Sequence, residues 1–216
     1  MWVGQQLPDG IRAVVFDVGE TLVDESRMWA EQAHAAGATP FTLMGLIGAL
    51  IERDEPHHAV WDILGVARPT VGTEIRSSDL YPDAFDCLRA AKGVGFKVGI
   101  AGNQPSAASK CLRSLGFDAD FVASSMEWGV AKPSVGFFSR IVGVSRVAPG
   151  EVLYVGDRLD NDILPAADFG LRTALLRRGP WGQIHSQRAD SSRADLRVGS
   201  LSELASMFRV RSTGAS

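Results

Sequence analysis

The sequence predicts an α/β protein with a doubly wound, mainly parallel sheet and a small helical insert. From residue 83 onward, short apolar runs alternate with amphipathic helical patterns, which is the rhythm of βαβ units. Successive units of this kind give parallel strands with helices on both faces of the sheet. Between residues 24 and 79 the only periodic patterns are helical. With 216 residues, of which 45% are hydrophobic, the chain can bury one substantial core.

The first expected strand covers residues 11–16, where an apolar run ends at Asp17. Three helical patterns follow it, separated by glycine and proline residues, at 25–36, 41–53 and 57–64. An insert at this place begins and ends near the tip of the first strand. We therefore expect residues 24–79 to form a small α-helical cap domain over that tip, with residues 1–23 and 80–216 forming the core domain.

The remaining elements alternate along the chain. Gly116 and Gly170 end two of the helices, and Ser200 with Glu203 forms a capping box before a final short helix. Residues 185–195 are polar, and we expect them to be mobile. The expected helices are 83–92, 105–115, 134–142 and 162–169, and the expected strands are 97–101, 121–123, 152–155 and 173–176.

Composition narrows the classes of partner. A formal net charge of −3 gives no basic field, so nucleic acid is not expected as a partner. No apolar run approaches the length of a membrane span, and the first residues lack the pattern of a leader, so we expect a cytoplasmic protein that binds no membrane. These features do not predict an oligomeric state.

Polar residues follow the first two expected strands. Asp17 ends the first strand, and AGNQP after the second places Gly102 and Asn103 at its tip. Carboxyl ends of parallel strands meet at one edge of a sheet, where open α/β folds bind their ligands. An Asp after a strand also serves simply to start a turn, and Gly and Asn do the same. As a ligand site, Gly102 would allow close approach of an anion, with Asn103 as a donor.

The third and fourth strands lead to charged residues. Lys132, one of only four lysines, precedes a proline at a strand-to-helix junction, where a point cation can neutralise a phosphate. The stretch YVGDRLDND places Asp157, Asp160 and Asp162 within six residues. Such a cluster repels itself unless a cation or a salt bridge intervenes, and hard oxygen ligands suit Mg²⁺.

These four motifs, in the order FDVGETL, AGNQ, AKP and VGDRLDND, resemble those of the haloacid dehalogenase-like superfamily of hydrolases over nearly the whole chain. The resemblance implies a Rossmann-like core and a nucleophilic Asp17 that forms an aspartyl intermediate. It also implies that Thr21 orients the site and that Lys132 balances charge on the nucleophile and the transferring group. The Mg²⁺ ligands that it implies are Asp17, the Gly19 carbonyl, Asp157 and Asp162.

The sequence departs from the family at two positions. Phosphatases of this family carry a second aspartate two residues after the nucleophile, which protonates the leaving group, and here that residue is Gly19. Glu20 is the nearest carboxyl group, but a side chain one step along a turning backbone points elsewhere. Gly102 stands where Ser or Thr is usual, which leaves Lys132, Asn103 and backbone N–H groups to bind the phosphate.

The motifs favour a Mg²⁺-dependent phosphatase that acts on a small phosphorylated metabolite. One alternative is a carbon–halogen hydrolase, whose halide leaving group needs no proton, although such relatives lack the acidic metal motif. Another is a catalytically weak or non-catalytic binding protein with the same fold. Candidate substrate contacts, most of which we expect to be surface or packing residues, are Arg27, Arg53, His57, His58, Trp61, Arg76, Arg177, Arg178 and Trp181.

Overall fold

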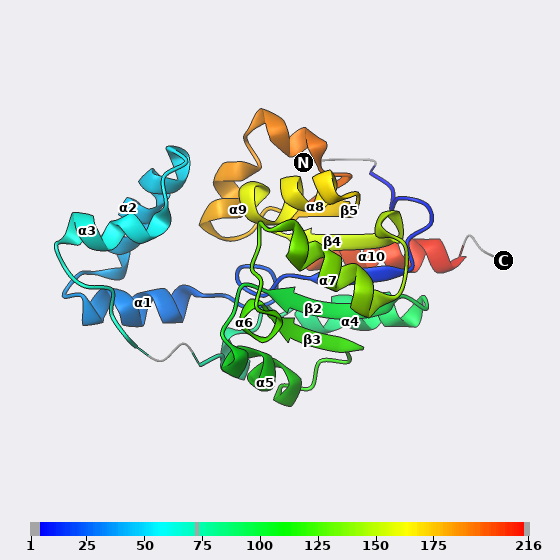
Figure 1. The fold of residues 1–216 in the computed structure, drawn as a ribbon, viewed down its shortest axis with the longest axis horizontal. Coiled ribbons are helices and arrows are strands. Elements are labelled where there is room, and N and C mark those ends of the chain that lie inside the picture. Colours follow the sequence, from blue (N-terminus) through cyan, green and yellow to red (C-terminus); the bar gives the residue numbers. More distant parts are fainter. Residues whose placement is uncertain (1–4, 72–73, 214–216) are drawn as a thin grey trace.

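A computed structural model describes residues 5–71 and 74–213 and contains one six-stranded, fully parallel sheet (Figure 1). The strand order is β3-β2-β1-β4-β5-β6. The prediction of a doubly wound, parallel α/β fold is confirmed. The strands are β1 (Ala13–Phe16), β2 (Lys97–Gly102), β3 (Phe121–Ser124), β4 (Val152–Gly156), β5 (Arg172–Leu176) and β6 (Leu196–Val198).

Alternate residues of the strands pack into two separate layers of core. Val14 and Phe16 of β1 lie in a cluster with residues of three helices, α4 (Ala84–Gly93), α5 (Ser106–Ser114) and α10 (Leu201–Thr213). Ala13 and Val15 point to the other face, where α7 (Val135–Ser145) and α8 (Leu164–Phe169) cover the sheet. The period of two along β1 thus buries both faces of the strand.

The chain order reverses beside the first strand. From β1 the chain proceeds to β2 and β3 on one side and returns to β4 on the other, where Phe16 is in register with Val155. Such a switch point opens a crevice beyond the carboxyl ends of the two strands. Asp17 follows β1 and Asp157 follows β4, so the fold itself brings these two carboxyl groups together.

The helical insert lies beyond the carboxyl ends of the strands, at one end of the molecule (Figure 1). Its backbone leaves and rejoins the core at adjacent points, because Val23 forms an isolated bridge with Leu80. The insert has a hydrophobic cluster of its own, which Trp181 of α9 (Gly179–His185) joins from the core side. Its helices are α1 (Ser26–Ala35), α2 (Pro40–Glu52) and α3 (Val60–Leu64).

No single helix among the described residues is long and apolar enough to cross a membrane. Only α1 and α2 together reach such a length and composition, and they are bent by 108° at their junction.

The C-terminal part of the core contains more structure than the sequence pattern predicts. Neither α9 nor β6 was expected, and α6 (Ser125–Trp128) is also additional. The polar stretch 185–195 includes a 3₁₀ turn at Ala189–Arg193. His185, the first residue of the stretch, is buried. The expected helix 162–169 is a π turn at Leu159–Ile163 followed by α8, where a proline occupies the first turn and needs no hydrogen-bond acceptor.

Candidate active site

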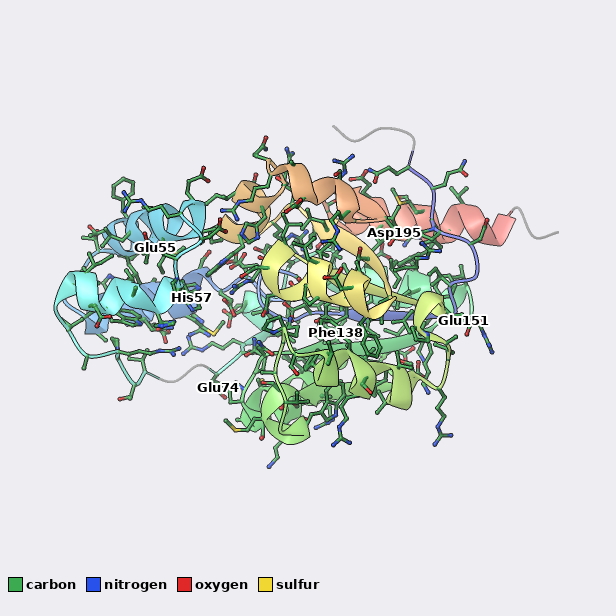
Figure 2. The ribbon with its side chains drawn as sticks, turned by 45° about the horizontal axis from the view of Figure 1, so that its top comes forward. Glu55, His57, Glu74, Phe138, Glu151 and Asp195 are labelled. Atoms are coloured by element: carbon green, nitrogen blue, oxygen red, sulfur yellow. The ribbon has the colours of Figure 1, made fainter. Side chains whose placement is uncertain are left out.

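A cavity of about 540 Å³ opens between the carboxyl edge of the sheet and the helical insert. Its core side carries Asp17, Asn103 and Asp157, which directly follow β1, β2 and β4, and Lys132, which lies in the segment between α6 and α7. The insert faces them across the cavity, and Figure 2 shows His57 on the part of the insert that faces the core. The insert residues that line the cavity are Glu25, Met28, Trp29, Gln32, His57 and Arg68.

A buried lysine joins two of the predicted site carboxylates. Lys132 Nζ lies 2.7 Å from Asp17 Oδ1 and 2.5 Å from Asp162 Oδ1, and its side chain is only 1% exposed. Burial alone would lower the pKa of Lys132, but the Asp162 and Asp17 carboxylates outweigh burial and hold its pKa well above the ordinary value. Lys132 is therefore a fixed cation beside Asp17. Burial raises the pKa of Asp17 to about 6, against the opposing effect of Lys132.

Three carboxyl groups converge at the same place. Oxygen atoms of Asp17, Asp157 and Asp162 lie within 4.8 Å of one another, and all three residues are buried. Asp157 Oδ2 has no hydrogen-bond partner among the described residues. Burial, followed by the charges of Asp162 and Asp17, raises the pKa of Asp157 well above its ordinary range. An orphaned, buried carboxylate oxygen within such a cluster fits a divalent cation with oxygen ligands.

The residues of the second predicted motif have structural contacts of their own. The Lys132 amide donates to Asn103 Oδ1 at 2.8 Å, and Asn103 Nδ2 donates to the Lys132 carbonyl at 2.9 Å. The Asn103 side chain thus holds the backbone of Lys132, a contact that the sequence did not predict. A β-carbon placed on Gly102 would lie 2.5 Å from Asp17 Oδ1, so this position has no room for a side chain while Asp17 keeps its place.

Position 19 faces a carboxyl group from the insert. A β-carbon placed on Gly19 would lie 2.5 Å from Glu25 Oε1 and 2.8 Å from Glu25 Cδ. Glu25 precedes α1, and its Oε2 accepts a hydrogen bond of 3.3 Å from Trp29 Nε1. Burial raises the pKa of Glu25 to about 7, and the nearby Glu20 and Asp17 carboxylates raise it further. Glu25 is not among the site residues predicted from the sequence.

Glu20 is anchored by two hydrogen bonds. Its Oε2 accepts from the Tyr81 hydroxyl at 2.6 Å, and its Oε1 accepts from the Glu25 amide at 3.0 Å. The Arg178 guanidinium lies 3.9 Å from the centre of the Tyr81 ring and donates to Asp83 at 2.7 Å. This network fixes the turn after Asp17 to the core. Glu20 and Arg178 therefore have structural roles in this arrangement.

Thr21 lies behind the turn. It is fully buried, does not line the cavity, and its hydroxyl has no hydrogen-bond partner among the described residues. Its carbonyl accepts from Arg178 at 3.1 Å. A role for Thr21 in orienting the site stays a prediction.

Further polar and aromatic side chains border the cavity near α9. Arg158 donates to Asp160 at 2.6 Å, and its guanidinium lies 4.8 Å from the centre of the Trp181 ring. Asp160 is thus paired with an arginine and stands apart from the three clustered carboxyl groups. His57 packs edge-on against Trp181, and burial lowers its pKa to about 4. The cavity is therefore bordered by arginine and aromatic groups on this side.

Most of the other substrate contacts suggested by the sequence lie elsewhere. Arg27 joins the two ends of the insert, since it donates to Asp79 at 2.7 Å and forms an ion pair with Glu31 at 2.7 Å. Arg68 and Arg158, which do line the cavity, were not among the candidates. Candidates outside the cavity lining are Arg27, Arg53, His58, Trp61, Arg76, Arg177 and Arg178.

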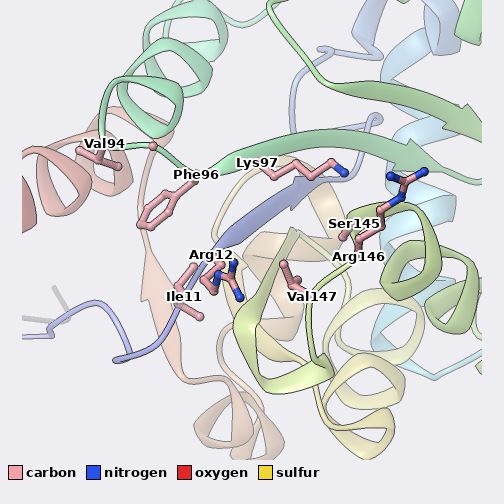
Figure 3. A pocket seen from close by; sticks show the side chains of 9 residues that line it. Ile11, Arg12, Val94, Phe96, Lys97, Ser145, Arg146 and Val147 are labelled. Atoms are coloured by element: carbon pink, nitrogen blue, oxygen red, sulfur yellow. The ribbon is translucent and has the colours of Figure 1, made fainter.

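A second cavity, of about 400 Å³, lies at the opposite edge of the sheet (Figure 3). It is formed where β1 and β2 begin and where α7 ends, and its charged lining groups are Arg12, Lys97 and Arg146. Lys97 Nζ donates to the Val144 carbonyl at 2.9 Å. Arg12 forms an ion pair with Glu151 at 3.7 Å, but no carboxyl group is among the described residues that line this cavity. The convergent carboxyl groups line the first cavity.

The family is established by comparison with known proteins. Residues 11–170 match the model of the haloacid dehalogenase-like hydrolases, and the chain therefore belongs to this family of hydrolases. A glyceraldehyde 3-phosphate phosphatase of Methanopyrus kandleri is 31% identical over 213 residues, covering 83% of this chain and 90% of that protein. A phosphoserine phosphatase of Thermus thermophilus is 31% identical over 134 residues, covering 61% of this chain and 52% of that protein.

Solved structures agree with the fold. The L-2-haloacid dehalogenase of Xanthobacter autotrophicus with covalently bound chloropropionic acid superposes with a TM-score of 0.68, at 20% identity, over 92% of this chain and 98% of that one. The hydrolase YfnB of Bacillus subtilis, bound to magnesium, has a TM-score of 0.67, at 18% identity, over 93% and 99%. At these identities the likeness establishes the shared α/β architecture.

Proposed function

We propose that this protein is a Mg²⁺-dependent phosphatase that acts on a small phosphorylated metabolite through an aspartyl intermediate at Asp17. The observation that carries the proposal is the position of Asp17, which stands at a strand tip 2.7 Å from a buried lysine and beside two further buried carboxyl groups. The names of the similar phosphatases support the choice of phosphate esters as substrates.

Asp17 would attack phosphorus with one carboxylate oxygen. Because Asp17 and a phosphate ester are both anions, they approach each other only where positive charge screens them. Lys132 provides one such charge at Asp17 itself. Its reciprocal hydrogen bonds with Asn103 fix its backbone, so the ammonium group is held in place before substrate arrives.

The residues that would hold Mg²⁺ are Asp17, Asp157, Asp162 and the Gly19 carbonyl. When bound, the ion would neutralise the carboxylate cluster and polarise the phosphoryl oxygens. Asp157 suits this role because its buried Oδ2 is left without a partner by the described protein atoms. Asp162 is already bonded to Lys132 and to the Arg158 amide, which fixes its orientation toward the cluster.

The helical insert, residues 24–79, would act as the cap domain and exclude water from the cavity. A cavity of about 540 Å³ suits a small metabolite. Arg68 and Arg158 line it together with Trp29 and Trp181, so a compact, anionic substrate would meet both positive charge and aromatic surface. This arrangement supports a small phosphorylated compound as the substrate class.

Carbon–halogen hydrolysis is less well supported. That reaction has no use for three buried carboxyl groups with an orphaned oxygen, which destabilise the folded protein unless a cation binds them. A non-catalytic binding role would leave the close pairing of Asp17 with Lys132 without a chemical purpose. Both alternatives give distinct results in a substrate screen.

The test is a screen of glyceraldehyde 3-phosphate, phosphoserine, 4-nitrophenyl phosphate and 2-chloropropionate, each with Mg²⁺ and with EDTA. We expect phosphate release that requires metal and is lost in Asp17→Asn, because an amide of nearly the same shape is a poor nucleophile. Phosphate release that persists in Asp17→Asn would contradict the proposal. Chloride release without metal would favour the dehalogenase alternative, and silence on every substrate would favour a binding role.

A further inference from the structure

The Glu25 carboxyl group stands where a side chain at position 19 would stand. A β-carbon on Gly19 would come within 2.5 Å of Glu25 Oε1, closer than β-carbons approach other atoms. Gly19 is not among the glycines with positive φ, so its backbone conformation does not require glycine. A side chain at position 19 would require the Glu25 carboxyl group to move from this place.

Contacts on both sides hold Glu25 in this place. The Glu25 amide donates to Glu20 Oε1 at 3.0 Å, and Glu20 is itself tied to Tyr81. Oε2 accepts from Trp29 Nε1, one turn into α1. Oε1, the atom nearest position 19, takes part in no side-chain hydrogen bond with the residues that the structure describes. The carboxyl group thus lines the same cavity as Asp17 with one oxygen available.

We propose that Glu25 is the general acid and base of this enzyme, and that it supplies from the start of α1 the carboxyl group that position 19 lacks. This inference rests on the proposed phosphatase function. It places a catalytic residue of the core reaction on the helical insert. The enzyme would then need the insert in position for proton transfer as well as for excluding water.

The two half-reactions balance with Glu25 in this role. As Asp17 forms its bond to phosphorus, the bond from phosphorus to the ester oxygen breaks, and the protonated Glu25 gives its proton to that oxygen. The alcohol then leaves. In the second half, a water molecule gives a proton to the Glu25 carboxylate as its oxygen attacks phosphorus. The bond between phosphorus and Asp17 breaks, which restores the Asp17 carboxylate and releases inorganic phosphate.

Two other groups near the cavity are less suited to this role. Both carboxylate oxygens of Glu20 already accept hydrogen bonds, from Tyr81 and from the Glu25 amide. The His57 ring packs edge-on against two tryptophans, with centroids 5.3 Å from Trp181 and 6.1 Å from Trp29. Among the described residues, the atoms nearest to a β-carbon at position 19 all belong to the Glu25 carboxyl group.

The test compares single turnovers of Glu25→Gln and wild type on glyceraldehyde 3-phosphate, an alkyl phosphate, and 4-nitrophenyl phosphate, an aryl phosphate, with saturating Mg²⁺. Loss of a general acid slows the alkyl reaction by about 10² to 10⁴-fold and leaves transfer from a good leaving group nearly unchanged. Loss of the base slows the second half-reaction, so phosphorylated Asp17 should accumulate in acid-quenched samples. Glu55→Gln is the matched control, because Glu55 is an exposed glutamate of the insert outside the cavity (Figure 2).

A second pair of variants tests whether positions 19 and 25 are equivalent. Gly19→Asp alone should not help, because the new side chain would crowd Glu25 and add a like charge beside it. Gly19→Asp combined with Glu25→Ala restores one carboxyl group at this place. The combined variant should regain at least about 10-fold of the alkyl phosphate activity that Glu25→Ala loses.

The outcomes separate this inference from the proposed function. A wild-type enzyme that is silent on both esters contradicts the phosphatase function itself. An active wild type whose Glu25→Gln variant releases both alcohols with equal loss of rate, or with no loss, contradicts the role of Glu25 alone. Failure of the combined variant to regain alkyl activity, while it still transfers phosphate from 4-nitrophenyl phosphate, contradicts the equivalence of the two positions.

Discussion

Asn103 and Lys132 hold each other by a reciprocal pair of hydrogen bonds, 2.8 Å from the Lys132 amide and 2.9 Å to its carbonyl. The two residues come from the ends of β2 and of the segment after β3, so the contact ties neighbouring strand tips together. It fixes the backbone from which the Lys132 side chain reaches Asp17. The Asn103 side chain thus affects Asp17 indirectly, by positioning Lys132.

Replacing Asn103 should therefore loosen the position of the Lys132 backbone while leaving the Lys132 charge in the site. We expect Asn103→Ala to lose about 1–3 kcal/mol of stability, because it removes two hydrogen bonds from partly buried backbone groups. Turnover should fall more than substrate affinity, since the ammonium group would be less well placed against Asp17. Urea unfolding and steady-state kinetics measure the two effects. Unchanged turnover in a destabilised variant would show that the contact serves the fold alone.

Removing the Lys132 charge should be more harmful, and the harm should depend on pH. Lys132→Met keeps much of the side-chain volume but leaves the buried Asp17 and Asp162 carboxylates without their cation, which we expect to destabilise the metal-free protein by about 3–5 kcal/mol. Burial already raises the pKa of Asp17 to about 6. Carboxyl groups with a raised pKa in the folded state destabilise it as pH rises and recover that stability as they take up protons.

The loss in free energy of unfolding that Lys132→Met causes should therefore become smaller as pH falls from 8 to 5. Chemical unfolding of both proteins in EDTA at several pH values measures it. Lys97→Met is a control, because Lys97 lies at the opposite edge of the sheet and bonds to a backbone carbonyl (Figure 3). A deficit that is constant with pH would mean that the lost packing matters and the lost charge does not.

Asp157 gives a test of the metal site that is independent of turnover. In the absence of metal, Asp157→Asn should be at least as stable as wild type. The substitution removes a buried carboxyl group, and both burial and two neighbouring carboxylates raise the pKa of that group. With Mg²⁺, wild type should gain thermal stability through binding, and the variant should gain much less. Thermal unfolding with increasing Mg²⁺ measures both effects. An equal gain in the two proteins would remove Asp157 from the metal site.

The order of strands and helices was predictable because each element carries its own pattern. The alternating runs after residue 83 require parallel strands, and residues at their tips must then share one edge of the sheet. Asp17, Lys132 and Asp157 were therefore expected at one place, and in the structure all three line the same cavity. The short β6 and α9 were not predictable, because three-residue strands and a helix with two glycines carry little periodicity.

The contact between Glu25 and Gly19 could not be predicted from the sequence, for a different reason. Five residues lie between them, and this intervening chain makes a turn in which Glu20 has a φ of 50° and Val23 bridges to Gly19 and Leu80. No local periodicity encodes such a path. The roles of Asn103 and Arg178 were missed similarly, because each depends on a partner from a distant part of the chain.

The last prediction concerns His185, whose side chain contacts the loop between Asp157 and Asp162. Its Nδ1 accepts a hydrogen bond of 3.0 Å from the Leu159 amide, so the imidazole fixes this loop only while Nδ1 is unprotonated. Burial lowers the pKa of His185 to about 4 from 6.5, and the positive charges of Arg188 and Arg158 also lower it. The unfolded chain therefore binds a proton near pH 6.5, whereas the folded protein binds it only near pH 4.

Stability should consequently fall as pH drops through 6.5 and keep falling until about pH 4, by at most about 1.4 kcal/mol per pH unit for this one proton. His57 and the carboxyl groups titrate in the same range, so the comparison must be with a variant. In His185→Asn the amide oxygen can accept the Leu159 hydrogen bond without titrating. We expect the free energy of unfolding of this variant to decline less steeply than that of wild type between pH 6.5 and 4, as measured by urea unfolding in EDTA. Parallel declines in the two proteins would show that His185 is protonated equally in the folded and unfolded states.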